Sequence, residues 1–109
     1  MTRVESVEDR VFRALADPSR RAIFETLARG ESAVKELTTR FEISQPAVSQ
    51  HLAVLKGAGL VSSRREGRHV YYRVDPRGVK PLEDWIEHYR AFWTRYVDRL
   101  ENLLDELDD

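Results

Sequence analysis

The sequence predicts a mainly α-helical fold with a small β-hairpin and a long C-terminal helix. Three observations lead to this prediction. Apolar residues recur at helical spacing in four short segments before Gly59. Between about residues 60 and 74 they alternate with polar residues, which is typical of a half-buried hairpin. From Arg77 to Leu107 the helical pattern returns and continues without a break.

Length and composition limit the kinds of protein that the chain can be. With 109 residues we expect a single domain over residues 1–109. The chain contains no cysteine, which excludes disulfides and thiolate metal sites. The N-terminus is too polar for a signal peptide, and no apolar run approaches the roughly 20 residues that span a bilayer. We therefore expect a cytoplasmic protein with no membrane partner.

The first two helices are predicted from their N-caps. Ser6 is a good cap for a helix over 7–16. Asp17 caps a second helix with Pro18 at its first position, where proline is favoured, and this helix runs to about Ala28. Two arginines follow this cap in the sequence, Arg20 and Arg21. They either contact phosphate or form ion pairs with acidic residues of their own domain, and we favour the ion pairs.

A third, short helix over about 33–41 is predicted after Ser32, which we expect to be its cap. A brief connection then leads to a fourth helix that Ser44 caps and that Gly59 ends in a left-handed conformation. Together these two helices make a helix-turn-helix over about residues 33–58. In such a unit the second helix lies in the major groove of DNA.

The exposed face of the fourth helix is the main evidence for DNA binding. Val48, Leu52 and Leu55 form its buried stripe. Outside this stripe the helix carries mostly short polar side chains, and Gln and Ser can form hydrogen bonds with base edges. The candidate DNA-binding residues of this helix are Ser44, Gln45, Pro46, Ser49, Gln50, His51 and Lys56. The alternative is an ordinary amphipathic surface helix, although such helices usually expose Glu, Lys and Arg.

His51 lies at the edge of the buried stripe and has two interpretations. It is either a half-buried histidine satisfied by a backbone group, or a phosphate contact at the flank of the helix. The sequence leaves both open.

The hairpin over about 60–74 is predicted to be a basic wing. Its strands, Leu60–Arg65 and His69–Val74, are joined at Glu66-Gly67, where Gly67 can supply a positive φ. The candidate DNA-binding residues of the wing are Arg64, Arg65, Arg68, His69 and Tyr71. Basic side chains at such a tip can contact phosphates or enter a minor groove. Alternatively, the charges protect the edges of the hairpin.

The net charge of −1 hides an asymmetry between the two parts of the chain. Residues 1–78 hold 14 Lys and Arg against 10 Asp and Glu, a balance of +4. Residues 79–109 hold 4 against 9, a balance of −5. Because the local charge governs attraction to phosphate, we expect the acidic C-terminal part to face away from DNA.

The helix over about 77–107 is predicted to be a dimerisation helix. Its apolar residues keep a four-three spacing that is typical of an interhelical seam. With two residues of the first helix, the predicted dimer interface consists of Val7, Val11, Leu82, Ile86, Tyr89, Trp93, Tyr96, Leu100, Leu103 and Leu107. Alternatively, the helix folds onto its own domain, or its aromatic residues line a ligand pocket.

The order of these elements and several motifs resemble the ArsR/SmtB family of winged helix-turn-helix repressors. The motifs are Asp17-Pro18-Ser19-Arg20-Arg21, the segment from Ser44 to Leu55, Gly59-Leu60-Val61 and Arg65-Glu66-Gly67-Arg68. The resemblance covers nearly all of residues 7–107. It implies a homodimer that binds double-stranded DNA at a palindromic operator, often in its own promoter, and represses transcription. It also implies dimer contacts through the first and last helices.

The chain departs from the metal-sensing members of this family. Those members use Cys near the third helix, or Asp, His and Glu on the last helix. Here only Asp84 and His88 are weak metal candidates, so the chain resembles a metal-independent, cysteine-less branch, and we expect no cofactor. The alternative function is a ligand- or metal-responsive repressor that uses the last helix. A protein or small-molecule effector is not identified, and the sequence shows no catalytic motif.

Overall fold

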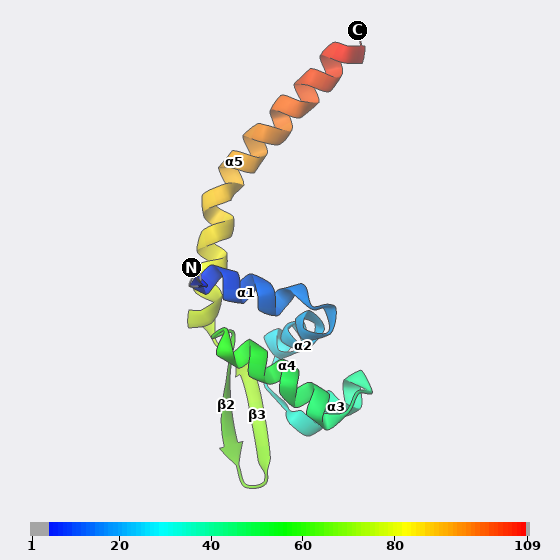
Figure 1. The fold of residues 1–109 in the computed structure, drawn as a ribbon, viewed down its shortest axis with the longest axis vertical. Helices are drawn as coiled ribbons and strands as arrows, with labels where there is room; N and C mark the ends of the chain where they lie inside the picture. The colour runs from blue at the N-terminus through cyan, green and yellow to red at the C-terminus, as the bar shows by residue number, and fades with distance from the viewer. Residues whose placement is uncertain (1–4, 109) are drawn as a thin grey trace.

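The computed structural model describes residues 5–108, so residues 1–4 and 109 of the predicted domain lie outside the described part. The elements are α1 (Val7–Ala16), α2 (Pro18–Arg29), β1 (Ser32–Ala33), α3 (Val34–Phe41), α4 (Gln45–Gly57), β2 (Val61–Glu66), β3 (His69–Val74) and α5 (Pro76–Asp108). This order confirms the predicted fold class, a mainly α-helical chain with a small sheet and a long C-terminal helix (Figure 1).

The predicted caps of the first two helices are confirmed. The Ser6 hydroxyl accepts from the backbone N–H of Asp9 at 3.1 Å, and the Asp9 carboxylate accepts from the backbone N–H of Ser6 at 3.4 Å. Asp17 accepts from the backbone N–H of Arg20 at 3.0 Å. Each cap satisfies backbone donors that the first turn of a helix leaves unpaired.

Arg20 and Arg21 bind backbone carbonyls instead of the acidic residues that we predicted. Arg20 donates to the carbonyl of Ala14 at 2.8 Å and to that of Arg13 at 3.1 Å. Arg21 donates to the carbonyl of Leu15 at 2.9 Å. The last carbonyls of a helix lack partners within the helix, and a cation near them is favourable. The two arginines therefore cap the C-terminus of α1 and join it to α2.

The third strand, β1, was not predicted from the sequence. It pairs with β3 antiparallel, Ser32 opposite Tyr72, and the strand order is β1-β3-β2. Ser32 therefore lies in a strand, and the prediction that it caps α3 is wrong. Ala33 occupies the N-cap position, and its backbone N–H donates to the Glu36 carboxylate at 3.3 Å. Through β1, the hairpin is hydrogen-bonded to the helical part of the chain.

Strand β3 has the predicted bounds, while β2 begins and ends one residue later than predicted and the turn shifts with it. Glu66 pairs with His69, so Gly67 and Arg68 form the turn in place of Glu66 and Gly67. Gly67 has the positive φ that we predicted, 62°. Tyr72 and Val74 of β3 pack against the core.

The core lies where α1–α4 meet the base of the hairpin. Its buried members are Val11, Ala14, Ile23, Leu27, Leu37, Val48, Leu52, Leu55, Leu60 and Val61. Val11 is only 1% exposed within the single chain, so its predicted place in the dimer interface is wrong. Leu82 packs partly against the same core. The helical spacing that placed both residues on an apolar stripe does not distinguish core from interface.

The C-terminus of α4 has the hydrogen bonds of a Schellman motif. The backbone N–H of Gly59 donates to Lys56 O at 2.9 Å, and that of Leu60 donates to Leu55 O at 3.0 Å. Gly59 has φ 81°, as predicted for a left-handed stop. Gly78 in the first turn of α5 lies directly against this turn, because a Cβ at Gly78 would come within 1.5 Å of Gly59 O. Two glycines thus allow α5 to start close to the end of α4.

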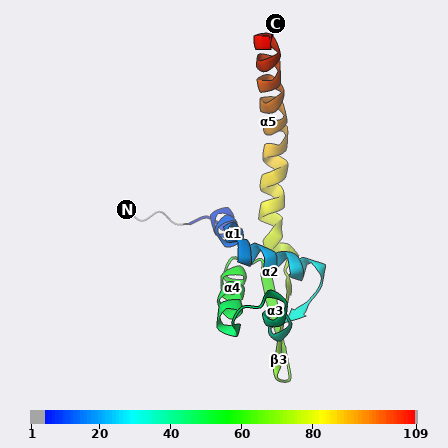
Figure 2. The same ribbon diagram turned by 90° about the vertical axis from the view of Figure 1, so that its right-hand side faces the viewer.

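The long helix α5 extends away from the other elements (Figures 1 and 2). With α5 included, the structure measures 68 × 36 × 26 Å. Pro81 lies inside α5, and a proline within a helix removes one backbone hydrogen bond and favours a kink. Helix α1 packs beside the start of α5, where the rings of Phe12 and Trp85 lie 5.0 Å apart. The hairpin and α4 lie at the opposite end from the tip of α5.

Candidate nucleic-acid interface

Helix α4 is fixed at its N-terminus by a short turn after α3. Glu42 adopts a left-handed conformation with φ 52° and reverses the chain. The Ser44 hydroxyl then accepts from the backbone N–H of Ala47 at 3.2 Å. The Ser44 side chain therefore serves as the cap of α4, and it remains exposed beside the start of the helix.

The two faces of α4 are separated as the sequence predicted. Val48, Leu52 and Leu55 are fully buried against the core. The exposed residues of the helix are Gln45, Pro46, Ser49, Gln50, Ala53, Val54, Lys56 and Gly57. Amides and hydroxyls on the first two turns can form hydrogen bonds with base edges, and Ala53 leaves room for close approach.

Lys56 lies at the far end of α4, near the wing. Its Nζ donates to the Ser63 hydroxyl on β2 at 2.8 Å. This bond joins the last turn of α4 to the hairpin. Lys56 is about 16 Å along the helix from Gln45, given a rise of about 1.5 Å per residue.

His51 is half-buried, as the structural interpretation expected, but its Nδ1 is buried without a hydrogen-bond partner among residues 5–108. Asp17 lies nearby. The pKa of Asp17 is lowered mainly by its hydrogen bond from the backbone N–H of Arg20, and the charge of His51 contributes less. His51 thus lies beside the corner between α1 and α2, and the predicted backbone partner for Nδ1 is not found.

Five basic side chains of the wing are exposed, and three of them, Arg65, Arg68 and His69, lie in or beside its turn. Arg65 faces Val70 across the hairpin, while Arg68 lies in the turn. The ring of His69 lies 6.3 Å from that of Tyr71. These cations lie at the tip of the hairpin, the part farthest from α5 (Figure 1).

Arg64 differs from the other wing cations because it is held by other side chains. It forms hydrogen bonds with both carboxylate oxygens of Glu31, the shortest at 2.6 Å, and one with Glu66 at 2.7 Å. Its guanidinium also lies 4.7 Å from the centre of the half-buried Tyr71 ring. The pKa of Glu31 is lowered mainly by its hydrogen bonds from Arg64, whose own pKa is raised. Arg64 therefore ties the wing to the loop before β1.

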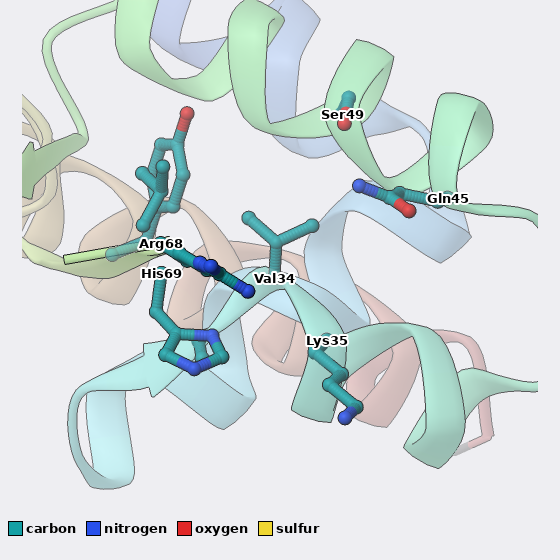
Figure 3. A pocket seen from close by; sticks show the side chains of 9 residues that line it. Val34, Lys35, Gln45, Ser49, Arg68 and His69 are labelled. Carbon is teal, nitrogen blue, oxygen red and sulfur yellow. The ribbon is translucent and has the colours of Figure 1, made fainter. Parts of the chain in front are cut away.

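A pocket of about 240 Å³ separates the exposed face of α4 from the wing (Figure 3). It is lined by Ala33, Val34, Lys35, Gln45, Ser49, Arg68, His69, Val70 and Tyr72. The structure thus brings two predicted residues of the recognition helix and two of the wing to one place. Lys35, from the first turn of α3, was not predicted. The only feature of the sequence that could have indicated Lys35 as a site residue is its positive charge in the first helix of a helix-turn-helix.

Helix α5 exposes an apolar face along its whole length. Its large exposed side chains are Trp85, Ile86, Tyr89, Phe92, Trp93, Tyr96, Val97, Leu100, Leu103, Leu104 and Leu107. Val7 of α1 is 56% exposed beside it. No residue of α5 among those described is buried. Beyond its first turns, which contact α1 and the core, this face lacks a covering element within residues 5–108.

The weak metal candidates on α5 have neighbours of their own. Asp84 forms an ion pair with Lys80 at 3.1 Å, and the ring of His88 lies 4.8 Å from that of Tyr89. A cleft of about 540 Å³ lies beside them, lined by Val7, Glu8, Pro81, Asp84, Trp85, His88 and Tyr89. Among residues 5–108 there is no group of three or more metal-ligating side chains. None of the helices in this range is both long enough and apolar enough to span a membrane.

Comparisons with known proteins identify the family. Residues 17–63 match the family described as bacterial regulatory protein, arsR family. The chain is 46% identical over 101 residues to the HTH-type transcriptional regulator Rv2034 of Mycobacterium tuberculosis. The aligned region covers 93% of this chain and 92% of that protein. It is 33% identical over 79 residues to the transcriptional repressor SdpR of Bacillus subtilis, which covers 72% of this chain and 88% of the relative.

Solved structures agree with this assignment. An ArsR-like transcriptional regulator from Rhodococcus sp. RHA1 has a TM-score of 0.68 at 31% identity, over 86% of this chain and 89% of that one. An exposed polar recognition helix, a basic wing and these relatives lead to the same conclusion. The chain belongs to the arsR family of bacterial regulatory proteins and is a DNA-binding transcriptional regulator, not an enzyme.

Proposed function

We propose that the chain is a homodimeric transcriptional repressor that binds a palindromic operator, with its own promoter among its targets. The observation that carries this proposal is the separation of two surfaces. A polar recognition face and a basic wing lie at one end, and an uncovered apolar helix lies at the other. The first surface fits DNA, and the second fits another copy of the chain. We expect it to act in the cytoplasm, where bacterial operators are.

On this proposal α4 enters the major groove with Gln45, Ser49 and Gln50 against base edges, and Ser44 and Pro46 beside them. All five side chains are exposed at the N-terminal end of the helix. Gln can form paired hydrogen bonds with adenine, while Ser is less selective. His51 and Lys56 lie farther from this end of the helix. On this proposal they contact only the sugar-phosphate backbone of the DNA, not the bases.

The wing adds attraction that does not depend on DNA sequence. Arg65, Arg68 and His69 are exposed, and the basic side chains can contact phosphates or enter the minor groove. Arg64 and Tyr71, which we also predicted as DNA-binding residues, pack against each other. We propose that they hold the wing in position while Arg65, Arg68 and His69 contact DNA.

The second copy is proposed to cover the apolar face of α5. The predicted interface residues Ile86, Trp93, Leu100 and Leu107 are between 43% and 80% exposed, an exposure that is a hazard for aggregation in a monomer. In a symmetric dimer this face is buried on both copies, and the dimer carries two recognition helices. Two recognition helices related by a two-fold axis match a palindrome with half-sites about 34 Å apart.

A gel-shift titration with DNA from upstream of the chain's own gene tests the DNA-binding face. The triple variant Gln45→Ala, Ser49→Ala, Gln50→Ala should lose most of its preference for the operator over unrelated DNA. Its non-specific affinity should persist, because phosphate contacts remain. A variant that keeps the wild-type preference for the operator would show that α4 does not read the sequence. Lys80→Gln, on α5, serves as the control and should bind like the wild type.

The cleft beside α1 and α5 supports a second candidate function, a ligand- or metal-responsive repressor. Its volume of about 540 Å³ falls in the range of roughly 300–1,000 Å³ that is common for small-molecule sites. Aromatic walls with Asp84 and His88 suit a small apolar ligand with a cationic group, or zinc. Titrating zinc or such a compound into the protein–operator complex tests this function. An operator affinity that stays constant throughout rules it out.

A further inference from the structure

The pocket between α3, α4 and the wing contains a group of basic side chains that direct base recognition does not explain. Lys35 lines it from α3, while Arg68 and His69 line it from the hairpin. Figure 3 shows the Gln45 amide and the Arg68 guanidinium directed toward the space between these elements. None of the lining residues is acidic. The pocket therefore presents hydrogen-bond donors and positive charge.

The charges of Lys35 and Arg68 have no counter-ion in the described part of the chain. Within residues 5–108 no ion pair shorter than 4 Å involves either side chain. The acidic residues on either side of Lys35 in the sequence have other partners. Glu31 binds Arg64, and Glu36 accepts from the backbone N–H of Ala33. This arrangement keeps Lys35 and Arg68 available for an external anion.

The size of the pocket favours a small anion. Its volume of about 240 Å³ is below the roughly 300–1,000 Å³ that is usual for sites of drug-sized molecules. Since water occupies about 30 Å³ per molecule in the liquid, the pocket has room for one phosphate group and several waters.

The position of the pocket indicates that this anion is a phosphate of the DNA backbone. In B-form DNA the major and minor grooves are separated by a sugar-phosphate backbone. A protein that places one element in the major groove and another in the minor groove must have that backbone between them. Here α4 and the wing are the two elements, and the pocket lies between them.

We propose that this pocket binds a backbone phosphate of the operator through Lys35 and Arg68. Gln45 and Ser49 border the pocket on the side of α4, where they face the base edges. This inference rests on the proposed function and adds to it a site and a residue, Lys35. The contact sets how far α4 enters the major groove, because it fixes the backbone between the helix and the wing. It carries no sequence information of its own.

Salt-dependent binding of the full-length protein to its operator duplex tests the proposal. Each phosphate contact contributes about 0.9 to the slope of log affinity against log salt concentration, through counterion release. A dimer has two such pockets, so Lys35→Gln with Arg68→Gln, which removes both cations from each bound phosphate, should reduce this slope by about 1.8. Lys35→Gln alone should reduce it by part of that amount, because Arg68 still contacts the phosphate. Both variants should weaken binding to operator and unrelated DNA by similar factors. Arg40→Gln, a cation of the same helix outside the pocket, is the control and should keep the wild-type slope.

A wild-type slope for Lys35→Gln, in a protein that binds its operator, overturns this proposal and leaves the proposed function intact. If the wild type fails to bind any DNA, the proposed function fails first. Thermal unfolding of each variant shows that its fold is kept.

A second measurement distinguishes the backbone from a free anion. An operator duplex with one neutral methylphosphonate at the phosphate between the protected grooves should bind the wild type more weakly. The same change should have little effect on the variant Lys35→Gln, Arg68→Gln, which lacks both cations. Equal losses for both proteins contradict the contact. Inorganic phosphate, titrated into the free protein at constant ionic strength, should leave the amide NMR signals of Lys35 and Arg68 unchanged. Saturable shifts of these signals would show a free-anion site instead.

Discussion

The dimer that we propose depends on a few large side chains of α5, and Trp93→Ala is the sharpest test of it. Trp93 is 50% exposed in the single chain. Aromatic side chains bury about 150–250 Å² each, so roughly 100 Å² of Trp93 is available to a partner. At about 25 cal/mol per Å² its burial contributes ~2.5 kcal/mol per copy, or ~5 kcal/mol for a symmetric pair. Because a tenfold change in affinity corresponds to about 1.4 kcal/mol, Trp93→Ala should weaken the dimer by roughly three orders of magnitude.

Sedimentation velocity over a dilution series measures this change directly. The wild type should sediment as a dimer, and Trp93→Ala should dissociate at concentrations where the wild type does not. Asp98→Ala is the matched control, since Asp98 lies about 140° around α5 from Trp93 on the exposed polar side. A dimer dissociation constant that is the same in Trp93→Ala and Asp98→Ala would refute the proposed role of this face. A wild type that stays monomeric at all concentrations would refute the dimer itself.

Three further predictions concern the scaffold that positions the DNA-binding elements. Gly78→Ala should lower the unfolding temperature, because its Cβ would come within 1.5 Å of Gly59 O and overpacking costs about 1–3 kcal/mol. Leu52→Ala, at a site that is fully buried, should lower the unfolding free energy in urea by about 2–5 kcal/mol; a smaller loss would mean that α4 packs loosely. The pKa of Glu31 is lowered from its usual 4.5 by its hydrogen bonds from Arg64, so this carboxylate stabilises the fold above pH 4.5 and loses its effect as pH falls through the lowered pKa. Urea titrations between neutral and acidic pH should show that decline in the wild type and a shallower one in Glu31→Gln, and identical curves would contradict the role of this ion pair.

Local signals were sufficient to predict most of the helical scaffold. Ser6, Asp17 and Ser44 each supply the side-chain oxygen that caps a helix, and all three caps are found. Gly59 and Gly67 have the positive φ values that their positions required. These features depend on residues within a few positions of each other, which is why the sequence alone indicates them.

Features that depend on distant parts of the chain could not be predicted in the same way. Strand β1 has only two residues, too few for a periodic pattern, and it exists because β3 pairs with it across the fold. Ser32 therefore resembles a cap by its position but lies in a strand. Arg64 appeared equivalent to the other basic residues of the wing, yet Glu31, 33 positions earlier in the chain, binds it.

Val11 shows a limit of helical periodicity. Its spacing from Val7 places both on one stripe of α1, and both were predicted at the dimer interface. In the structure Val11 is 1% exposed and Val7 is 56% exposed. The stripe turns gradually around the helix, so one end faces the core and the other faces outward. Periodicity identifies an apolar face, but which neighbour covers it depends on the tertiary structure.

The central claim is that two copies of α4 read a palindrome together. Hydroxyl-radical footprinting of the purified protein on DNA from upstream of its own gene tests this most directly. We predict two protected patches on one face of the duplex, related by a two-fold axis and centred about one helical turn, or about 34 Å, apart. A single protected patch, or no protection at low salt where phosphate contacts are strongest, would contradict the account.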